Sequence, residues 1–212
     1  MMKQNEFDKL SSDLRQLAAR IPLKWGRVQN NRSDDQIDLF SIHSYAELEA
    51  AVSQFRDEEK NYLRRRWFMW KCSACDEFLF YRNPNTQQNP DPYDKEYDIL
   101  IAGKYKFDVK GTVIPKEMRD RAEELIGFFY DRQSTGRRYG IQNRLFIVHH
   151  SFVSKERELY LCCAWGTKQD AYARFCDSVD RVRLFESHCV TAAVIFLLER
   201  EKGVAASEFL LK

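Results

Sequence analysis

The sequence predicts an α/β (α+β) fold in which one central mixed sheet is flanked by helices. Three features of the chain support this class. Residues 6–21 carry apolar side chains every three or four positions, two short strand-like segments meet at Gly103, and Leu145 to Val148 form a continuous apolar run. An apolar run of this kind is typical of a central strand that is covered on both faces. The chain therefore combines helices with a sheet that is buried in its middle.

The length and composition favour one globular domain spanning residues 1–212. We expect it to consist of a helical N-terminal appendage over residues 1–59, a core over residues 60–165, and C-terminal helices over residues 166–212. Hydrophobic residues make up 44% of the chain and charged residues 31%, which is an ordinary mix for a protein that buries a core. The net charge of +2 does not indicate nucleic-acid binding by itself, so any basic surface must be local.

The N-terminal appendage is predicted to be mainly helical. Apolar residues recur at helical spacing from Phe7 to Ile21, and Pro22 should end this first helix. Residues 37–42 have the pattern of a short strand. Ser44 to Glu47 form a capping-box pattern, which predicts a helix that begins there and runs, with a break, to about Tyr81.

The remaining elements follow from local composition. The proline-rich stretch at residues 83–92 predicts a loop. Beyond it, we expect strands at 97–102, 104–113, 144–152 and 159–165, and helices from 115 to about 129, at 167–182 and at 186–202. The longest apolar run, Val190 to Leu198, falls in the last of these helices and is far shorter than the ~20 residues that cross a bilayer. No membrane partner is therefore expected.

The two strands around Gly103 bring two carboxylates together. If the hairpin loop has three residues centred on Gly103, Asp98 faces Asp108 directly, whereas a two-residue loop would put them on opposite faces. Directly opposed residues have Cβ atoms roughly 4.5–5.5 Å apart, so two such carboxylates repel each other unless a cation neutralises them. Lys110 follows Asp108 by two positions and therefore shares its face, while the aromatic and apolar residues between the charges point to the core.

The carboxylate pair predicts a divalent metal site. Asp98, Asp108 and the backbone carbonyl of Val109 supply the oxygen ligands that Mg²⁺ or Mn²⁺ prefers, with waters completing an octahedron. The amine of Lys110 would hold a scissile phosphate or help to activate the attacking water. The arrangement suits hydrolysis of a phosphodiester bond.

These residues resemble the signature of the PD-(D/E)xK nuclease superfamily, in which an acidic residue opens one strand and Asp/Glu-x-Lys lies on the next. Here Asp98 is followed, after nine residues, by Asp108-Val109-Lys110, and Tyr97 stands where the superfamily often has proline. The resemblance covers residues 60–152 and implies a restriction-endonuclease-like αβββαβ core. Endonucleases and other DNA-cleaving hydrolases share this core.

A further acid and a basic surface complete the predicted site. Nucleases of this superfamily often carry an acidic residue on the helix before the hairpin, and Glu77 is the preferred candidate, ahead of Asp76. The basic positions nearest the motif would form a track for a phosphate backbone. These nucleic-acid-binding positions are Lys104, Lys106, Lys116 and Arg119.

The predicted function is that of a Mg²⁺- or Mn²⁺-dependent nuclease in the cytoplasm, with DNA as the favoured substrate. Cutting both strands of a duplex needs two active sites, which is compatible with a homodimer. The cytoplasmic location rests on six cysteines placed in apolar or helical stretches, as in reduced proteins, and on an N-terminus without an apolar signal segment.

Two alternatives to the nuclease stay open. The first is a catalytically inactive nuclease-like domain that binds nucleic acid or a protein partner. The second is a structural or interaction protein, in which Asp98 and Asp108 merely form ion pairs with Lys106 or Lys110 on an open face.

Overall fold

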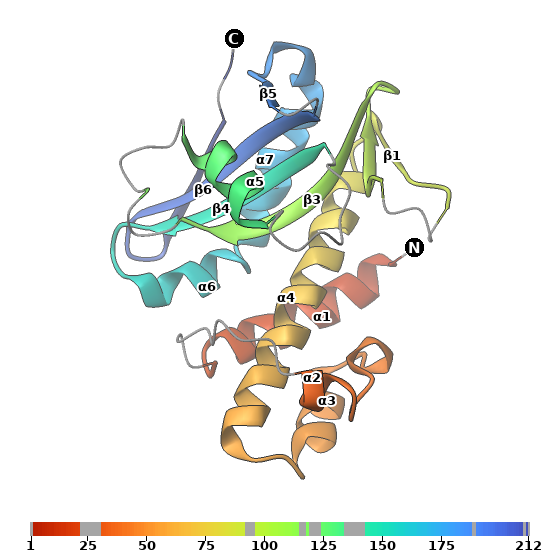
Figure 1. Ribbon diagram of the computed structural model, residues 1–212, viewed down its shortest axis with the longest axis vertical. Helices are drawn as coiled ribbons and strands as arrows, with labels where there is room; N and C mark the ends of the chain where they lie inside the picture. Colours follow the sequence, from red (N-terminus) through yellow and green to blue (C-terminus); the bar gives the residue numbers. More distant parts are fainter. Residues whose placement is uncertain are drawn as a thin grey trace. The chain divides into compact units, whose positions relative to one another are not determined.

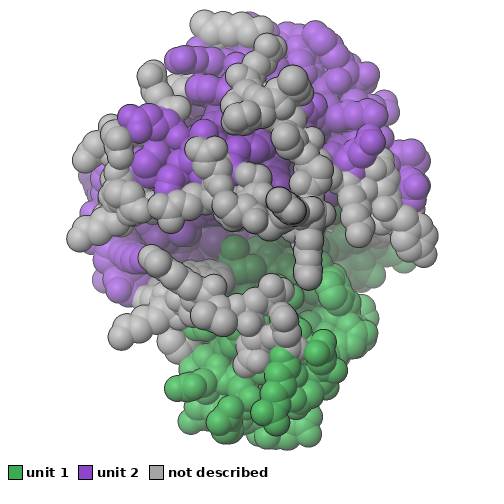
Figure 2. Space-filling view, viewed as in Figure 1, with its two compact units in different colours: residues 1–78 green, residues 79–212 purple. Residues whose placement is uncertain are grey.

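The computed structural model describes residues 2–21, 31–91, 96–114, 118, 124–133, 143–187, 190–209 and 211. The chain forms two compact units, residues 1–78 and residues 79–212, which Figure 2 colours separately. The division falls inside a long helix rather than after residue 59, where the sequence suggested that the core begins. That the whole chain behaves as one domain stays a prediction.

The first unit is helical in its described part. It contains α1 (Gln4–Ala18), α2 (Asn31–Asp34), the 3-10 turn η1 (Leu39–Ser41), α3 (Tyr45–Val52) and most of α4 (Asp57–Tyr81). The predicted first helix is confirmed as α1, because its apolar stripe, which includes Leu14 and Leu17, is buried. Trp67 and Phe68 of α4 are also fully buried, so aromatic residues fill much of this small core.

The short strand predicted at residues 37–42 is wrong. The Asp38 carboxylate accepts a hydrogen bond from the backbone N–H of Phe40 (2.9 Å), and this local bond turns the chain into η1. Short polar side chains compete in this way with the hydrogen bonds of a sheet.

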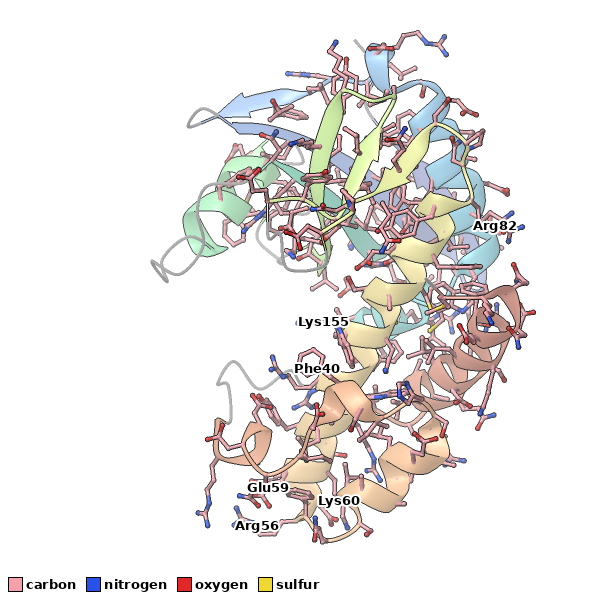
Figure 3. All side chains as sticks on the ribbon, turned by 90° about the vertical axis from the view of Figure 1, so that its right-hand side faces the viewer. Phe40, Arg56, Glu59, Lys60, Arg82 and Lys155 are labelled. Carbon is pink, nitrogen blue, oxygen red and sulfur yellow. The ribbon has the colours of Figure 1, made fainter. Side chains whose placement is uncertain are left out.

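The predicted long helix with a break is confirmed as α3 followed by α4. α3 begins where the Ser44 hydroxyl accepts a hydrogen bond from the Glu47 N–H (3.3 Å). Residues 53–56 separate the two helices. An ion pair between Arg56 and Glu59 (3.2 Å) lies at the beginning of α4 (Figure 3).

The second unit is built on a mixed sheet. Within the described residues the sheet has seven strands: β1 (Thr86–Gln88), β2 (Ile99–Ile101), β3 (Tyr105–Val113), β4 (Arg144–Ser151), β5 (Phe185–Ser187), β6 (Val190–Glu201) and β7 (Val204–Glu208). Their order across the sheet is β1-β2-β3-β4-β6-β5, and β7 pairs with β6. The predicted α+β class with one mixed sheet is confirmed.

Strand β3 changes its partner along its length. Residues 105–107 pair with β2 in the antiparallel sense, and residues 108–113 pair with β4 in the parallel sense. β4 in turn pairs in parallel with β6 along its whole length. The change of partner occurs at Asp108, which therefore lies at the junction of the hairpin and the parallel strands.

Helices cover both faces of the parallel strands (Figure 1). On one face, Phe129 of α5 (Leu125–Gln133) lies 4.8 Å from Phe146 of β4, ring centroid to ring centroid. On the other face, Phe175 of α7 (Trp165–Asp177) lies 6.4 Å from Phe107 of β3. The register aligns Phe146 with Lys110, and aligned residues of neighbouring strands share a face. Lys110 therefore lies on the α5 face, and Phe107 on the α7 face.

The C-terminal part corrects the sequence prediction. The helices expected over residues 166–212 are α7 followed by β5, β6 and β7, so the helix predicted at residues 186–202 is wrong. The apolar run of β6 shows no alternation because side chains on both of its faces are buried, and its periodicity alone cannot distinguish a strand from a helix. Residues 159–165, predicted as a strand, form most of the short helix α6 (Glu158–Leu161), a turn and the start of α7.

Other predicted elements are confirmed with shorter bounds. The hairpin strands, the central strand and the helix after residue 166 correspond to β2, β3, β4 and α7. The predicted loop at residues 83–92 contains the three-residue strand β1. No helix within the described residues combines the length and the apolar character that crossing a bilayer requires.

Candidate metal centre

The β2–β3 hairpin has the three-residue loop that the carboxylate hypothesis required. The ladder ends at the pair of Ile101 with Tyr105, so residues 102–104 form the loop. Ala102 and Gly103 have φ angles of 53° and 64°, a left-handed conformation that glycine adopts without steric cost. Continuing the same register places the two predicted carboxylates opposite each other, as the sequence indicated.

The backbone of Asp98 is held by three elements. Its N–H donates to the carbonyl of Phe107 in β3 (2.9 Å). Its carbonyl accepts from the Tyr81 hydroxyl at the end of α4 (3.1 Å) and from the N–H of Asn89, just after β1 (3.3 Å). The residue that opens β2 is therefore fixed in place independently of its side chain.

The side chain of Asp98 completes the hydrogen bonding at the junction in β3. Its Oδ2 accepts a hydrogen bond from the N–H of Val109 (2.8 Å), which lies beyond the last pair of the β2–β3 ladder. In an extended strand the N–H and C=O of one residue point to the same side. The Val109 carbonyl, predicted as a metal ligand, thus faces the side on which Asp98 lies.

The carboxylate of Asp108 lies between two cations. Lys110 Nζ is 2.6 Å from Oδ1, and Arg144 Nε is 3.5 Å from Oδ2. Lys110 is therefore on the face of Asp108, as predicted. Arg144 is a neighbour because β3 and β4 align it directly with Asp108, and its guanidinium lies 5.6 Å from the ring centroid of Tyr130 in α5.

Sequence reasoning missed Arg144 as part of this site. The register between two parallel strands depends on the long connection between them, which local alternation does not determine. One signal was nevertheless present, because Arg144 is a charged residue that opens an otherwise apolar strand. The same feature singled out Asp98.

Crowding of the two carboxyl groups affects the protonation of Asp98. Burial raises the pKa of Asp98 to about 6, and the adjacent carboxyl group of Asp108 contributes to the increase. The Val109 N–H and the Lys110 ammonium act in the opposite direction but are outweighed. Two carboxyl groups in direct contact are stabilised by a cation that binds both.

The oxygen donors of Asp98, Asp108 and the Val109 carbonyl are of the type that Mg²⁺ and Mn²⁺ prefer. Carboxylates and a backbone carbonyl are hard oxygen donors, and Mg²⁺ usually keeps several waters beside one or two carboxylates. Within the described residues, no group of three or more His, Cys, Asp or Glu side chains could hold a metal ion. A site at Asp98 and Asp108 would accordingly depend on water and on the Val109 carbonyl for its remaining ligands.

The roles of the other predicted site residues stay predictions. Glu77 belongs to the first unit, so its role stays a prediction. Lys106 is exposed, and its Nζ lies 4.7 Å from the ring centroid of Tyr97. Lys116 and Arg119 lie outside the described residues.

Lys104 does not share the face of Asp108. It belongs to the hairpin loop, and its Nζ donates to the hydroxyl of Tyr105 (3.0 Å). That hydroxyl in turn donates to Asp180, which follows α7 (2.7 Å). The ammonium of Lys104 is thereby directed to the α7 face, opposite to Asp108, and its contact with nucleic acid stays a prediction.

A second buried carboxylate lies at the other end of β4. Glu199 of β6 accepts hydrogen bonds from the Ser151 hydroxyl (2.7 Å), from Arg157 Nε (2.7 Å) and from the N–H of Gly203 (2.7 Å). Burial acts to raise the pKa of Glu199, but these donors outweigh it and lower the pKa to about 2. Sequence reasoning missed this cluster, because its two segments, residues 151–157 and 199–203, are far apart in the chain.

Two cysteines of the first unit and one histidine of the sheet are buried. Cys72 and Cys75, both in α4, are buried and form no disulfide. His149 is buried, and its Nδ1 lies 3.0 Å from the carbonyl of Thr112. Burial is the main cause that lowers the pKa of His149 to about 3.

The chain matches no protein-family model, and no curated protein and no solved structure is significantly similar to it.

Proposed function

We propose that the protein is a Mg²⁺- or Mn²⁺-dependent nuclease that hydrolyses phosphodiester bonds, with DNA as the favoured substrate. The observation that carries this proposal is the hairpin register, in which Asp98 lies opposite Asp108, with the Lys110 ammonium 2.6 Å from Asp108. Two acids and a lysine on adjacent strands are the residue types that metal-assisted hydrolysis of a phosphate ester requires.

The order of the elements supports the same proposal. A helix, three strands, a helix and a strand follow one another from α4 through β1, β2, β3 and α5 to β4. In the described part of the chain, this order matches the αβββαβ pattern that the resemblance implies. Asp98 immediately precedes the second of these strands, and Asp108-Val109-Lys110 lies within the third.

Each residue of the motif has a distinct role in this proposal. Asp98 and Asp108 would hold the divalent ion together with the Val109 carbonyl. When bound, the ion supplies Lewis-acid stabilisation of the negative charge that develops on the phosphate. Lys110 would hold the scissile phosphate or orient the attacking water through its ammonium. Glu77 is retained as a further candidate ligand.

The decisive test compares the wild type with Lys110→Ala on plasmid, linear duplex and single-stranded substrates, in Mg²⁺ or Mn²⁺. We expect metal-dependent cleavage by the wild type and a loss of roughly 100-fold or more in the variant, since one charged group at the reacting phosphate is removed. Lys202→Ala, an exposed lysine in the turn after β6, is the matched control and should retain full activity. A wild type that cleaves none of the substrates, or a variant that cleaves as fast, contradicts the proposal.

One observation favours the inactive, binding-only alternative. Asp108 already has two cations of the chain itself as neighbours, as expected for a structural ion cluster. Such a protein would bind DNA in EDTA as tightly as in Mg²⁺, and Mn²⁺ would not raise its Tm. The purely structural alternative accounts for the Asp108–Lys110 ion pair, but among the described residues Asp98 accepts a hydrogen bond from the backbone of Val109 rather than from a lysine.

A further inference from the structure

The position of the Lys110 ammonium conflicts with simultaneous metal binding at the same oxygen. Nζ lies 2.6 Å from Oδ1 of Asp108. Mg²⁺ bound to a carboxylate oxygen lies about 2.1 Å from it. An ammonium group and a metal ion at these distances compete for the same lone pairs and repel each other as like charges.

The two cations beside Asp108 differ in their freedom to move. The side chain of Arg144 is 8% exposed, and its guanidinium lies over the ring of Tyr130. The side chain of Lys110 is 45% exposed and ends a flexible four-carbon stem. Arg144 is therefore held by its surroundings, whereas the Lys110 side chain has room to move into solvent.

We infer that Lys110 occupies the position of the metal ion on Asp108 in the metal-free protein and is displaced when the ion binds. The inference rests on the proposed function and deepens it by assigning a regulatory contact to the same site. Arg144 stays in place in both states and acts as a positioning residue for Asp108.

The exchange makes the lysine available only in the metal-bound protein. Without the ion, the Lys110 ammonium is engaged by Asp108. With the ion bound, the ammonium is released beside the site, where it can contact a phosphate or a water. The order of events is therefore metal binding first and engagement of the substrate by Lys110 second.

Metal affinity provides the first test. Mn²⁺ binding is measured by titration calorimetry on the full chain without nucleic acid, for the wild type, Lys110→Met and Lys106→Met. Because Lys110→Met removes the competing charge, its Kd for Mn²⁺ should fall by roughly tenfold or more. The Kd of Lys106→Met should match that of the wild type, because the Lys106 ammonium lies over the ring of Tyr97, before β2, and not on Asp108. Lys110→Gln provides a second neutral variant if Lys110→Met does not fold.

Chemical reactivity of the amine provides the second test, on the unaltered chain. The acetylation rate of Lys110, relative to that of Lys106, is followed by mass spectrometry with and without Mg²⁺. Release from Asp108 should increase the relative rate for Lys110 by severalfold.

The outcomes separate this inference from the proposed function. A Kd that is unchanged or higher in both neutral variants, or a relative acetylation rate that Mg²⁺ leaves unaltered, overturns the exchange while metal binding by the wild type still stands. If the wild type binds neither ion, the proposed function fails and the exchange fails with it.

Discussion

The two ends of β4 hold buried carboxylates under opposite conditions. At the carboxyl end, Glu199 is buried but accepts hydrogen bonds from three donors, which hold its pKa at about 2. At the amino end, Asp98 is half-buried opposite the buried Asp108, and its pKa is raised to about 6. Glu199 is thus stabilised by hydrogen-bond donors of the chain itself, whereas Asp98 is destabilised by the neighbouring carboxyl group.

The difference separates a structural cluster from a candidate functional one. A satisfied buried ion contributes to stability and offers nothing to a ligand. A crowded pair of acids costs stability in the free protein, and that cost is relieved by a bound cation. Substitutions at the amino end should therefore lower activity without lowering stability. Substitutions at the carboxyl end should lower stability and leave metal binding unaltered.

The largest expected effect is on activity at the amino end. Asp98→Asn should lower metal-dependent cleavage by about 100- to 1,000-fold, because it removes a charged metal ligand. In EDTA its Tm should equal or exceed that of the wild type, since the neutral amide no longer repels Asp108. Cleavage assays and thermal unfolding measure both quantities, and a variant that cleaves at the wild-type rate would remove Asp98 from the site.

The next effect is on stability at the carboxyl end. Glu199→Ala should lower the free energy of unfolding by about 3 kcal/mol, because Arg157 and Ser151 lose their buried partner. Glu208→Ala is the control, since Glu208 forms an exposed ion pair with Arg200 that contributes less than about 1 kcal/mol. Urea unfolding measures both variants, and the Kd for Mn²⁺ should be unaltered in each. Equal losses of stability in the two variants would contradict the assignment of Glu199 as the structural cluster.

A smaller effect concerns the pH dependence of stability at the carboxyl end. The pKa of Glu199 is about 2 in the folded protein and is ordinarily 4.5, so the unfolded chain binds the proton more readily. Its contribution is therefore complete above about pH 4.5 and is lost as the pH falls toward 2. In Glu199→Gln the free energy of unfolding should vary less with pH in this window. An identical acid slope in wild type and variant would show that Glu199 is not responsible.

The smallest effect is expected at the exposed surface beside the amino end. Lys106→Ala should reduce DNA affinity only slightly. The slope of the logarithm of the DNA binding constant against the logarithm of the salt concentration should become shallower by about 1, as for the loss of one phosphate contact. Fluorescence anisotropy in EDTA measures binding without cleavage. A slope that does not change places Lys106 outside the nucleic-acid interface.

The hairpin could be predicted because two independent patterns agreed. The alternation of apolar and charged residues along β3 predicted which face is buried, and Gly103 marked the loop. The register depended on a three-residue loop, which the structure has. The central strand β4 was equally clear from its continuous apolar run.

The remaining features depend on contacts that the local sequence does not encode. β6 resembles a buried helix because both of its faces are covered, and β1 is a short polar strand, Thr86–Gln88, that pairing with β2 stabilises. The contact of Arg144 with Asp108 follows from the parallel register of β3 and β4. Predicting each of these would require the order of the strands first.

The change of partner within β3 has a consequence for hydrogen exchange. β2 is joined to β3 by three residue pairs, whereas β4 is joined to β6 by eight. Amides of β2 should therefore exchange with solvent through local opening far faster than those of β4. Asp98 precedes the weakly held strand, and Asp108 begins the strongly held segment. A metal ion bound to both carboxylates would link the local stability of β2 to that of residues 108–113 in β3. Slower amide exchange in β2 on adding Mg²⁺ would show this link directly.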